Sequence, residues 1–416
     1  MRAYERLLDY VAIHTTSDEA SETVPSTARQ FDLANRLKEE MLALGIEDAA
    51  VDSNCYVTGH IPASKGCEDA PSIGFISHLD TSPDSSGENV HPVIHENYDG
   101  GDVEIGNGLI LRTELFPHLK TLKGRTLITT DGTTLLGADD KAGISEIMTM
   151  AEEVLNNNIP HGKICIAFTP DEEIGHGAAL LDLEKFGASF AYTVDGGAEN
   201  GIEYENFNAA KAVFKIKGIS VHTGDAKDKM VNAALLACEI SSMLPSAETP
   251  SHTEGREGFY HLTDISGDVE NAEIAFIVRD HDPGFFSARE QTLRNIEKRM
   301  NEKYGKGTVS LTLTEEYQNM IEKIRPHMHI VETAKRCIQE QGVQPFEVPI
   351  RGGTDGARLS YRGLPCPNLG TGGYAFHGPY EHITAEAMDV VTQILCSIVK
   401  DYSSENDCSL RRPLFR

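Results

Sequence analysis

Two acidic stretches decide the fold of this chain: Gly137-Ala138-Asp139-Asp140-Lys141-Ala142-Gly143 and Thr169-Pro170-Asp171-Glu172-Glu173. Each follows an apolar, β-prone run and opens a turn or a helix. Two further apolar runs end in the same way, one at His78-Leu79-Asp80 and the other at Asp195. In an open α/β sheet the chemistry lies at the carboxyl ends of the strands. These stretches therefore predict a sheet whose edge carries histidine and carboxylate side chains.

The first half of the chain alternates strands with helices. We predict helices over 28–44 and from about Lys141 onward, and strands over 55–61, 72–77, 126–130, 163–169 and 189–194. Such alternation favours a mostly parallel central sheet, so the predicted class is α/β. Residues 82–125, rich in Gly, Asp, Asn, His and Pro, are predicted to be a long and partly irregular insertion with an open role.

The pattern changes after about residue 205. The predicted order there is β-α-β-β-α-β, typical of a ferredoxin-like α+β sandwich, over 211–218, 231–244, 258–265, 272–278, 283–303 and 308–313. Helix, strand and helix then resume over 326–341, 344–349 and 384–400. We therefore predict a catalytic domain formed by 1–206 and 319–416, with an inserted lid domain over 207–318.

Composition excludes several classes of function. The chain has 416 residues and a formal net charge of -27, which disfavours nucleic acid and anionic membranes as partners. We find no signal-peptide pattern and no apolar run long enough to span a bilayer. The eight cysteines form no CxxC pair, and several lie in apolar runs, which favours buried free thiols in a reducing cytoplasm.

The histidines and acids at the strand ends are the candidate metal ligands. A two-metal hydrolytic site needs nitrogen and oxygen ligands, and the candidates are His78, Asp140, Glu173, Asp195 and a late histidine. Each motif alone has a plainer interpretation. The His-x-Asp motif can be structural, Asp139 can cap a helix, and the acids at 171–173 can form a solvated loop. The set of motifs in this order is more specific than any member.

The late histidine is predicted in the glycine-rich stretch 370–378, which ends in His377-Gly378, with His382 as a competitor. No Gly-Lys-Ser/Thr follows these glycines, so a phosphate-binding loop is disfavoured. Asp80 lies two residues beyond His78 and can reach its other ring nitrogen. In the 171–173 triplet, one acid can bind metal while its neighbour stays free as a general base.

Together these motifs resemble those of the cocatalytic dizinc metallopeptidases, a group that includes aminoacylases and carboxypeptidase G-type enzymes. Within the group they resemble the peptidase T family of tripeptide aminopeptidases. The resemblance covers essentially the whole chain. It is carried by His78-Leu-Asp80-Thr, Gly-Ala-Asp-Asp140-Lys-Ala-Gly, Thr-Pro-Asp-Glu172-Glu173-Ile-Gly, Val-Asp195-Gly-Gly, Val221-His222-Thr-Gly, Arg351-Gly-Gly-Thr-Asp-Gly and Phe-His377-Gly.

The resemblance implies two zinc ions per subunit, with cobalt or manganese as possible substitutes. It implies that Asp140 bridges the ions, that His78 and Asp195 complete one shell, and that Glu173 and His377 complete the other. It also implies a cis peptide bond between Asp139 and Asp140. We expect these ligand roles from the resemblance alone.

The resemblance further implies roles for the groups around the ions. Asp80 would orient His78, Glu172 would be the general base, and His222 would stabilise the oxyanion. From the residues alone, plainer interpretations are favoured for two of these groups: His222 as a turn histidine, and Arg279 as an exposed strand residue paired with a neighbouring acid. The implied contacts to the far end of the substrate are Asn232, Arg279 and Arg351, since guanidinium groups pair well with a carboxylate.

The resemblance implies short peptides as substrates and a homodimer as the assembly. The predicted activity is removal of the N-terminal residue from tripeptides. Two alternatives stay open: an N-acyl amino acid amidohydrolase or dipeptidase of the same group, and a catalytically silent metal-binding scaffold. An intact Glu172 argues against the silent scaffold, because such a protein has no need of a free base beside its ligands.

Overall fold

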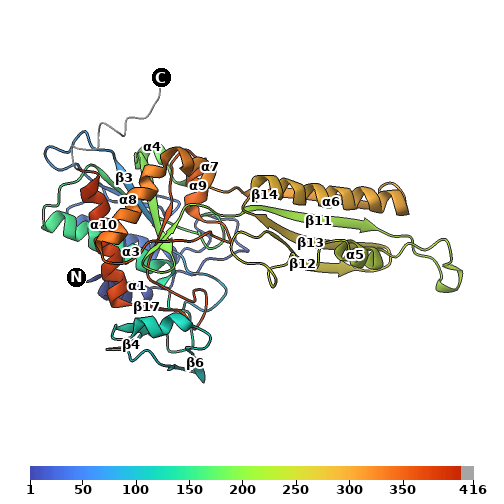
Figure 1. Ribbon diagram of the computed structural model, residues 1–416, viewed down its shortest axis with the longest axis horizontal. Coiled ribbons are helices and arrows are strands. Elements are labelled where there is room, and N and C mark those ends of the chain that lie inside the picture. Colours follow the sequence, from blue (N-terminus) through green and yellow to red (C-terminus); the bar gives the residue numbers. More distant parts are fainter. Residues whose placement is uncertain (404–416) are drawn as a thin grey trace. The chain divides into compact units, whose positions relative to one another are not determined.

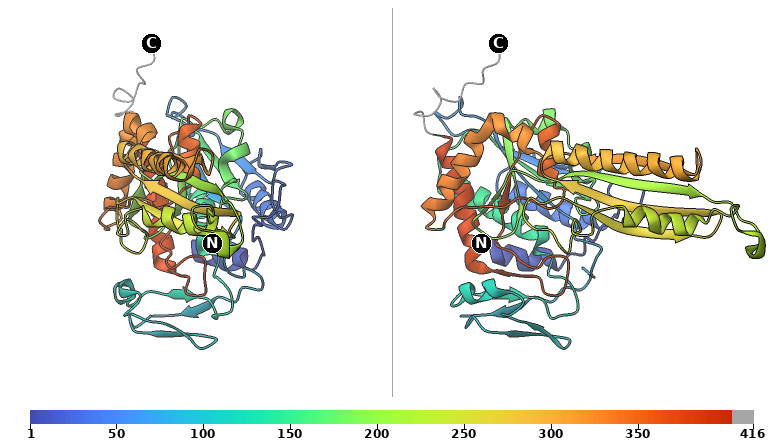
Figure 2. Two further views of the ribbon diagram at one scale, coloured as in Figure 1. Left: turned by 90° about the vertical axis from the view of Figure 1, so that its right-hand side faces the viewer. Right: turned by 45° about the vertical axis from the view of Figure 1, so that its right-hand side comes forward.

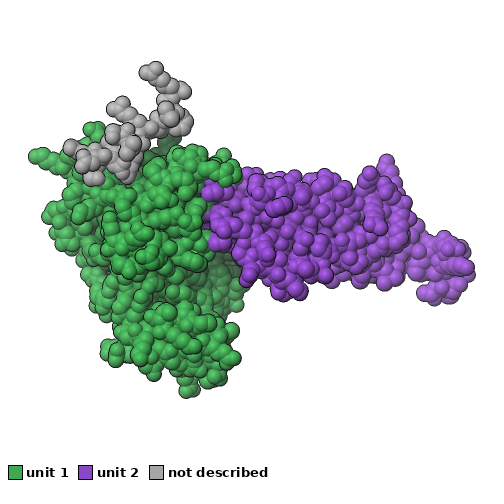
Figure 3. Space-filling view, viewed as in Figure 1, with its two compact units in different colours: residues 1–204, 322–348, 354–416 green, residues 205–321, 349–353 purple. Residues whose placement is uncertain are grey.

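The structure, a computed structural model, describes residues 1–403 (Figure 1). The chain forms two compact units, coloured separately in Figure 3. Unit 1 comprises Met1–Tyr204, Glu322–Val348 and the described residues from Thr354 onward, and unit 2 comprises Glu205–Ile321 and Pro349–Gly353. Our predicted lid was 207–318, and the short segment around Arg351 was not part of that prediction.

Unit 1 is built on an eight-stranded sheet. In spatial order its strands are β1 (Ala50–Val51), β2 (Val57–Ile61), β8 (Ile164–Thr169), β3 (Ile73–His78), β9 (Phe190–Gly196), β16 (Asn368–Gly370), β10 (Gly201–Glu203) and β15 (Phe346–Glu347). The four central strands β8, β3, β9 and β16 are mutually parallel, while β2 and β10 run antiparallel to their neighbours β8 and β16. The predicted α/β class with a mostly parallel sheet is confirmed.

Helices cover both faces of this sheet. Along β3, Gly74 and Ile76 face Phe186 and its cluster, whereas Ser77 points to the opposite face and to Gly143. The helices on the Ser77 face are α1 (Ala3–Val11), α2 (Gln30–Ala43), α3 (Ala138–Asn156), α8 (Met328–Glu340) and α10 (Ala385–Asp401), and those on the other face are α4 (Leu183–Phe186) and α9 (Asp355–Tyr361). Helix α1 was not predicted.

The start of α3 lies unusually close to the sheet. Gly137 has φ +78°, a left-handed conformation that glycine adopts without strain. A Cβ atom on Gly143 would lie 1.9 Å from the carbonyl oxygen of Val194, so only glycine allows this approach. Gly137 and Gly143 therefore allow Asp139 and Asp140, which lie between them in the sequence, to approach the ends of β3 and β9.

Unit 2 contains a four-stranded antiparallel sheet with two helices (Figure 2). Its elements are β11 (Asn208–Lys217), α5 (Ala233–Ser242), β12 (Phe259–Gly267), β13 (Asn271–Asp280), α6 (Pro283–Tyr304) and β14 (Val309–Tyr317). The strand order β12-β13-β11-β14 confirms the predicted ferredoxin-like arrangement. Alternate residues of β11, such as Ala212 and Phe214, join α5 and α6 in one hydrophobic core.

The insertion over 82–125 is more regular than we predicted. It holds strand β4 (Val93–His95), the hairpin of β5 (Val103–Gly106) and β6 (Leu109–Leu111), and the 3-10 helix η1 (Pro117–Leu122). Strand β4 pairs with β7 (Leu127–Thr129), whose other edge pairs with β17 (His382–Thr384). This small sheet ties the insertion to a segment far along the chain.

The remaining short elements are η2 (Gly177–Leu180), η3 (Thr223–Asp225), α7 (Ile321–Ile324) and η4 (Arg325–His327). Among the described residues, no helix combines the length and apolar character needed to cross a bilayer. The seven cysteines of the described chain are unpaired, whereas Cys408 lies outside it.

Candidate metal centre

The candidate centre lies at the carboxyl ends of three adjacent parallel strands. His78 is the last residue of β3, Asp195 is the penultimate residue of β9, and Glu172 and Glu173 follow the end of β8. Because the strand order is β8-β3-β9, residues far apart in the sequence meet at one edge.

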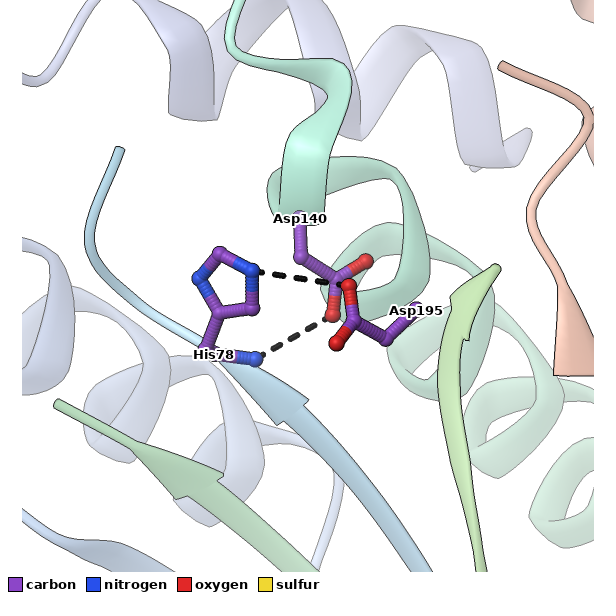
Figure 4. Close-up of side chains that lie close together, drawn as sticks. All are labelled: His78, Asp140 and Asp195. Carbon is purple, nitrogen blue, oxygen red and sulfur yellow. Dashed lines mark hydrogen bonds and ion pairs between the residues drawn. The ribbon is translucent and has the colours of Figure 1, made fainter. Parts of the chain in front are cut away.

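The first ligand group is formed by His78, Asp140 and Asp195 (Figure 4). One potential ligand atom from each residue lies within 4.8 Å of the others. The Nε2 atom of His78 lies 3.5 Å from Asp195. A carboxylate oxygen of Asp140 accepts a hydrogen bond of 3.1 Å from the backbone N–H of His78.

The second ligand group contains Glu173 and His377. The Nε2 atom of His377 lies 3.0 Å from a carboxylate oxygen of Glu173 and 3.2 Å from Oδ2 of Asp139. His78, Asp139 and Glu173 also offer ligand atoms within 4.8 Å of one another. The structure thus brings all five predicted ligands into one region and adds Asp139 to them.

The two adjacent aspartates play different parts. Asp139 lies between the histidines, since Oδ1 accepts from His78 at 3.0 Å and Oδ2 lies 3.2 Å from His377. Both oxygens of Asp140 instead accept backbone N–H groups, from His78 and from Gly143. The predicted bridging role of Asp140 between two metal ions stays a prediction. In the structure, the carboxylate of Asp139 lies within hydrogen-bond distance of both histidines, whereas Asp140 groups with His78 and Asp195. The peptide bond between Asp139 and Asp140 is cis, as the resemblance implied.

Asp80 supports the site in two ways. The Nδ1 atom of His78 donates to the main-chain carbonyl of Asp80 at 2.9 Å, and the Asp80 carboxylate lies 3.4 Å from the same nitrogen. The carboxylate also accepts the backbone N–H groups of Glu172 and Glu173, at 3.0 and 3.2 Å. One buried side chain therefore connects the histidine on β3 with the acidic loop after β8.

Asp171, the first acid of the triplet, is anchored away from the centre. Its buried carboxylate accepts hydrogen bonds from the backbone and hydroxyl of Ser26 and from the side chain of Gln30. No described residue donates to the carboxylate of Glu172. The triplet thus contains an anchored acid (Asp171), an acid that accepts no hydrogen bond from the described chain (Glu172) and a candidate ligand (Glu173).

The electrostatics of the site fit divalent cations. Burial and Asp139 raise the pKa of Glu173 to about 7, and hydrogen bonds to Asp139 and Glu173 raise the pKa of His377 to about 11. Burial opposes ionisation of Asp139, but its hydrogen bonds with His377 and His78 lower its pKa. These shifts arise because carboxylates and histidines are crowded together in a buried site. In the metal-free protein the histidines stay protonated, and divalent cations would take the place of those protons.

One orphaned atom points the same way. Oε1 of Glu173 is buried and has no hydrogen-bond partner in the described chain. Such an atom is unfavourable without a cation or donor. The set of imidazole and carboxylate donors suits zinc and related divalent ions. The residues present therefore fit a pair of metal ions.

The other predicted site residues are not among these candidate ligands. The competitor His382 is fully buried in β17, where Nε2 lies 2.8 Å from His118 of the insertion. Of the other histidines of the insertion, which were not among the predicted ligands, His91 is exposed and His95 contacts Thr129. His222, Asn232, Arg279 and Arg351 all belong to unit 2, whereas the candidate ligands belong to unit 1.

Sequence reasoning missed Glu381, which binds the turn before Asp139. Its carboxylate accepts the backbone N–H groups of Leu136, Gly137 and Asp139. No local signal identifies it, because its partners are more than two hundred residues away. The adjacent His382 was considered only as a metal ligand.

Comparisons with known proteins agree with this geometry. The sequence profile described as peptidase family M20/M25/M40 matches residues 131–401. The chain is 52% identical to peptidase T of Alkaliphilus oremlandii over 403 residues, covering 96% of this chain and 98% of that protein. It is also 52% identical to a peptidase T of Clostridium perfringens over 406 residues, covering 97% and 100%.

Solved structures share the fold. Aminopeptidase PepT of Bacillus cereus and a tripeptidase of Staphylococcus aureus each superpose with a TM-score of 0.76 at 22% identity, covering 97% of this chain and 98% of theirs. A dinuclear metal-binding peptidase of the same family from Bacillus subtilis gives a TM-score of 0.64 at 15% identity, covering 96% and 98%. With the profile match and the full-length identity, these findings show that the chain belongs to peptidase family M20/M25/M40 and, within it, to the peptidase T group.

Proposed function

We propose that this protein is a two-metal aminopeptidase that removes the N-terminal residue from tripeptides. The observation that carries the proposal is the convergence of two imidazoles and several carboxylates beside the uncommitted Glu172. The names of its relatives supply the substrate class.

We propose zinc as the ion, with cobalt or manganese as substitutes. His78 and Asp195 would hold one ion, and Glu173 and His377 the other. The resemblance assigns the bridge to Asp140. The contacts of Asp139 to both histidines favour Asp139 in that role, with Asp140 fixing the backbone of His78. Divalent ions in such a site supply Lewis acidity, which polarises the scissile carbonyl and lowers the pKa of water.

Glu172 is the proposed general base. Burial and the neighbouring Asp195 raise the pKa of Glu172 well above its ordinary value in the metal-free protein, so it readily holds a proton. It would take a proton from the attacking water and pass it to the leaving amine. Asp80 would keep Glu172 in place through its backbone N–H and would orient His78.

His222 is the proposed donor to the developing oxyanion. In unit 2 its Nδ1 accepts the backbone N–H of Gly224 at 3.1 Å, so the neutral ring carries its proton on Nε2. The exposed ring can therefore offer an N–H to a substrate oxygen.

Asn232, Arg279 and Arg351 are the proposed contacts to the far end of the peptide. Asn232 caps α5, Arg279 pairs with Glu316, and Arg351 donates to carbonyls of the loop before β12. Binding of a substrate carboxylate by either arginine would have to exchange some of these bonds.

A substrate panel tests the proposal. The metal-free protein is reconstituted with zinc, cobalt or manganese and offered di-, tri- and tetrapeptides with free and acetylated N-termini. We expect a preference for free tripeptides and loss of activity with chelator. Turnover of acetylated amino acids or of dipeptides alone would support the amidohydrolase or dipeptidase alternative instead.

The variant Glu172→Gln tests the base. The amide cannot accept the proton, so kcat should fall by about 10²–10⁴-fold while metal content is retained. The metal content of the variant, measured by elemental analysis, is the control. Full activity with normal metal content would refute the assignment, and metal binding without any turnover in the unaltered protein would favour a silent scaffold.

We also propose a homodimer in the cytoplasm. Strand β12 forms an edge of the unit 2 sheet and exposes Leu262 and Ile265. The unpaired cysteines of the described chain suit a reducing compartment. Light scattering after size-exclusion chromatography tests the assembly, and a monomeric mass at micromolar concentration would contradict it.

A further inference from the structure

Glu381 is a buried acid that the proposed reaction does not use. Its side chain is 1% exposed and accepts three backbone N–H groups. One oxygen accepts from Leu136 at 2.7 Å and Gly137 at 2.8 Å, and the other accepts from Asp139 at 2.9 Å. These donors belong to the turn that presents the two aspartates to the metal centre.

A buried lysine interacts with the carboxylate of Glu381. Lys141 is almost completely buried, and its ammonium group donates to the carbonyl of Ile13 at 2.7 Å. The charge of Lys141 interacts favourably with Glu381. Both carboxylate oxygens of Glu381 accept backbone N–H groups of the turn, so the side chain restrains the turn at three points.

The insertion fixes Glu381 from the other side. The next residue, His382, begins β17, which pairs with β7, and β7 pairs with β4 of the insertion. The Nδ1 atom of His382 donates to the carbonyl of Tyr380 at 2.7 Å, so Nε2 is the acceptor for His118 at 2.8 Å. The ring of His118 also stacks on Tyr374 at 4.0 Å.

We propose that Glu381 is a positioning residue that holds the 136–139 turn in its metal-binding conformation, and that the insertion over 82–125 braces Glu381 through His118 and the β17-β7-β4 sheet. The proposal rests on the proposed two-metal site. It concerns metal binding and turn geometry, whereas the substrate class is a separate matter.

The physical consequence of removing the carboxylate follows from its contacts. With Glu381→Ala, three buried N–H groups lose their acceptor, so the turn must move to satisfy them. With Glu381→Gln, the amide oxygen can still accept from the N–H groups of Leu136 and Gly137. The side-chain NH2 group then faces the N–H of Asp139, and neither group can accept from the other. Both changes displace Asp139, and the glutamine variant does so with little change in side-chain volume.

Metal affinity of the metal-free protein is the test. Zinc is titrated against a chromogenic chelator for the unaltered protein, Glu381→Gln and the matched control Glu297→Gln. Glu297 of α6 also accepts a backbone N–H, from Leu311 at 2.9 Å, but belongs to unit 2 and not to the β17-β7-β4 sheet. We expect Glu381→Gln to weaken binding of at least one ion by about 10–100-fold, the range typical of groups that orient metal ligands.

The control separates positioning from general destabilisation. We expect Glu297→Gln to bind zinc within twofold of the unaltered protein, and the melting temperatures of the two metal-free variants to be similar. Affinity of Glu381→Gln within twofold of the unaltered protein, or an equal loss in both variants, would overturn the positioning role. Activity of Glu381→Gln should partly recover in excess zinc, and a loss of kcat that excess zinc leaves unchanged would also overturn it.

A second variant tests the brace. His118→Ala removes the donor to His382 without touching the turn, and we expect zinc affinity to fall in the same direction by a smaller factor. Unchanged affinity would overturn the role of the insertion. Because the affinity measurements use zinc alone, they stand even where the peptide panel fails. Normal zinc binding without peptide turnover would count only against the proposed activity.

Discussion

Replacing Gly143 with alanine should displace the start of α3 and impair the metal centre. The added Cβ would lie 1.9 Å from the carbonyl oxygen of Val194, 2.5 Å from Oδ1 of Asp140 and 2.6 Å from Oγ of Ser77. A comfortable carbon–oxygen contact needs about 3.4 Å, so the helix start must retreat by roughly 1.5 Å. The atom of Val194 is a backbone oxygen of a central strand, so this closest contact cannot be relieved by a rotamer change.

The expected magnitudes follow from this displacement. Overpacking of this kind destabilises a protein by about 1–3 kcal/mol, and a misplacement of about 1 Å at an active site can lower the rate about 10²-fold. Because Gly143 also donates its backbone N–H to Asp140, the shift reaches the ligand carboxylates directly. We therefore expect folded protein with at least tenfold weaker zinc binding.

The assay compares Gly143→Ala with Gly197→Ala. Gly197 lies two residues beyond Asp195, and a Cβ there meets nothing within 4 Å. Circular dichroism with urea unfolding gives the stability, and chelator competition and peptide turnover give the function. Gly143→Ala with zinc affinity and kcat within twofold of Gly197→Ala would refute the reasoning.

The two aspartates and the protons of the centre give two further predictions. Asp139→Asn should lower zinc stoichiometry or affinity more than Asp140→Asn, because only Asp139 contacts both histidines. Elemental analysis of both variants measures the zinc content. A larger loss of zinc in Asp140→Asn would support Asp140 as the bridging ligand. Zinc must displace protons from His377, whose pKa is about 11, and below about pH 7 from Glu173 as well. Apparent zinc affinity should therefore fall as pH falls, and more steeply below about pH 7. Calorimetry in buffers of different ionisation enthalpy measures how many protons are released on zinc binding. A pH-independent affinity would contradict the assignment of His377 and Glu173 as ligands.

Much of the fold follows from local patterns in the sequence. The apolar runs of β3, β8 and β9 are buried on both faces, so their composition alone marks them as strands of a parallel sheet. The alternation in β11 and β13 predicts a second, one-sided sheet. The insertion was predicted poorly because its strands are only three or four residues long and depend on distant partners.

The candidate site was predicted less completely than the fold. Motifs placed His78, Glu173, Asp195 and His377 together because strand ends and a glycine-rich turn mark them. Asp139 and Asp140 are chemically identical neighbours, and no pattern decides which one points between the histidines. That choice depends on the non-helical backbone at both residues, with ψ of 105° and 32°.

By itself, the sequence determined the α/β class, the inserted ferredoxin-like unit and the chemical nature of the site, because periodicity, turn residues and acids at strand ends are local properties of the chain. Only the tertiary structure decided that β8, β3 and β9 are adjacent, that Asp139 lies between the two histidines and that Glu381 holds the turn. Those features depend on pairings across many residues and on backbone angles set by packing, which no local pattern records.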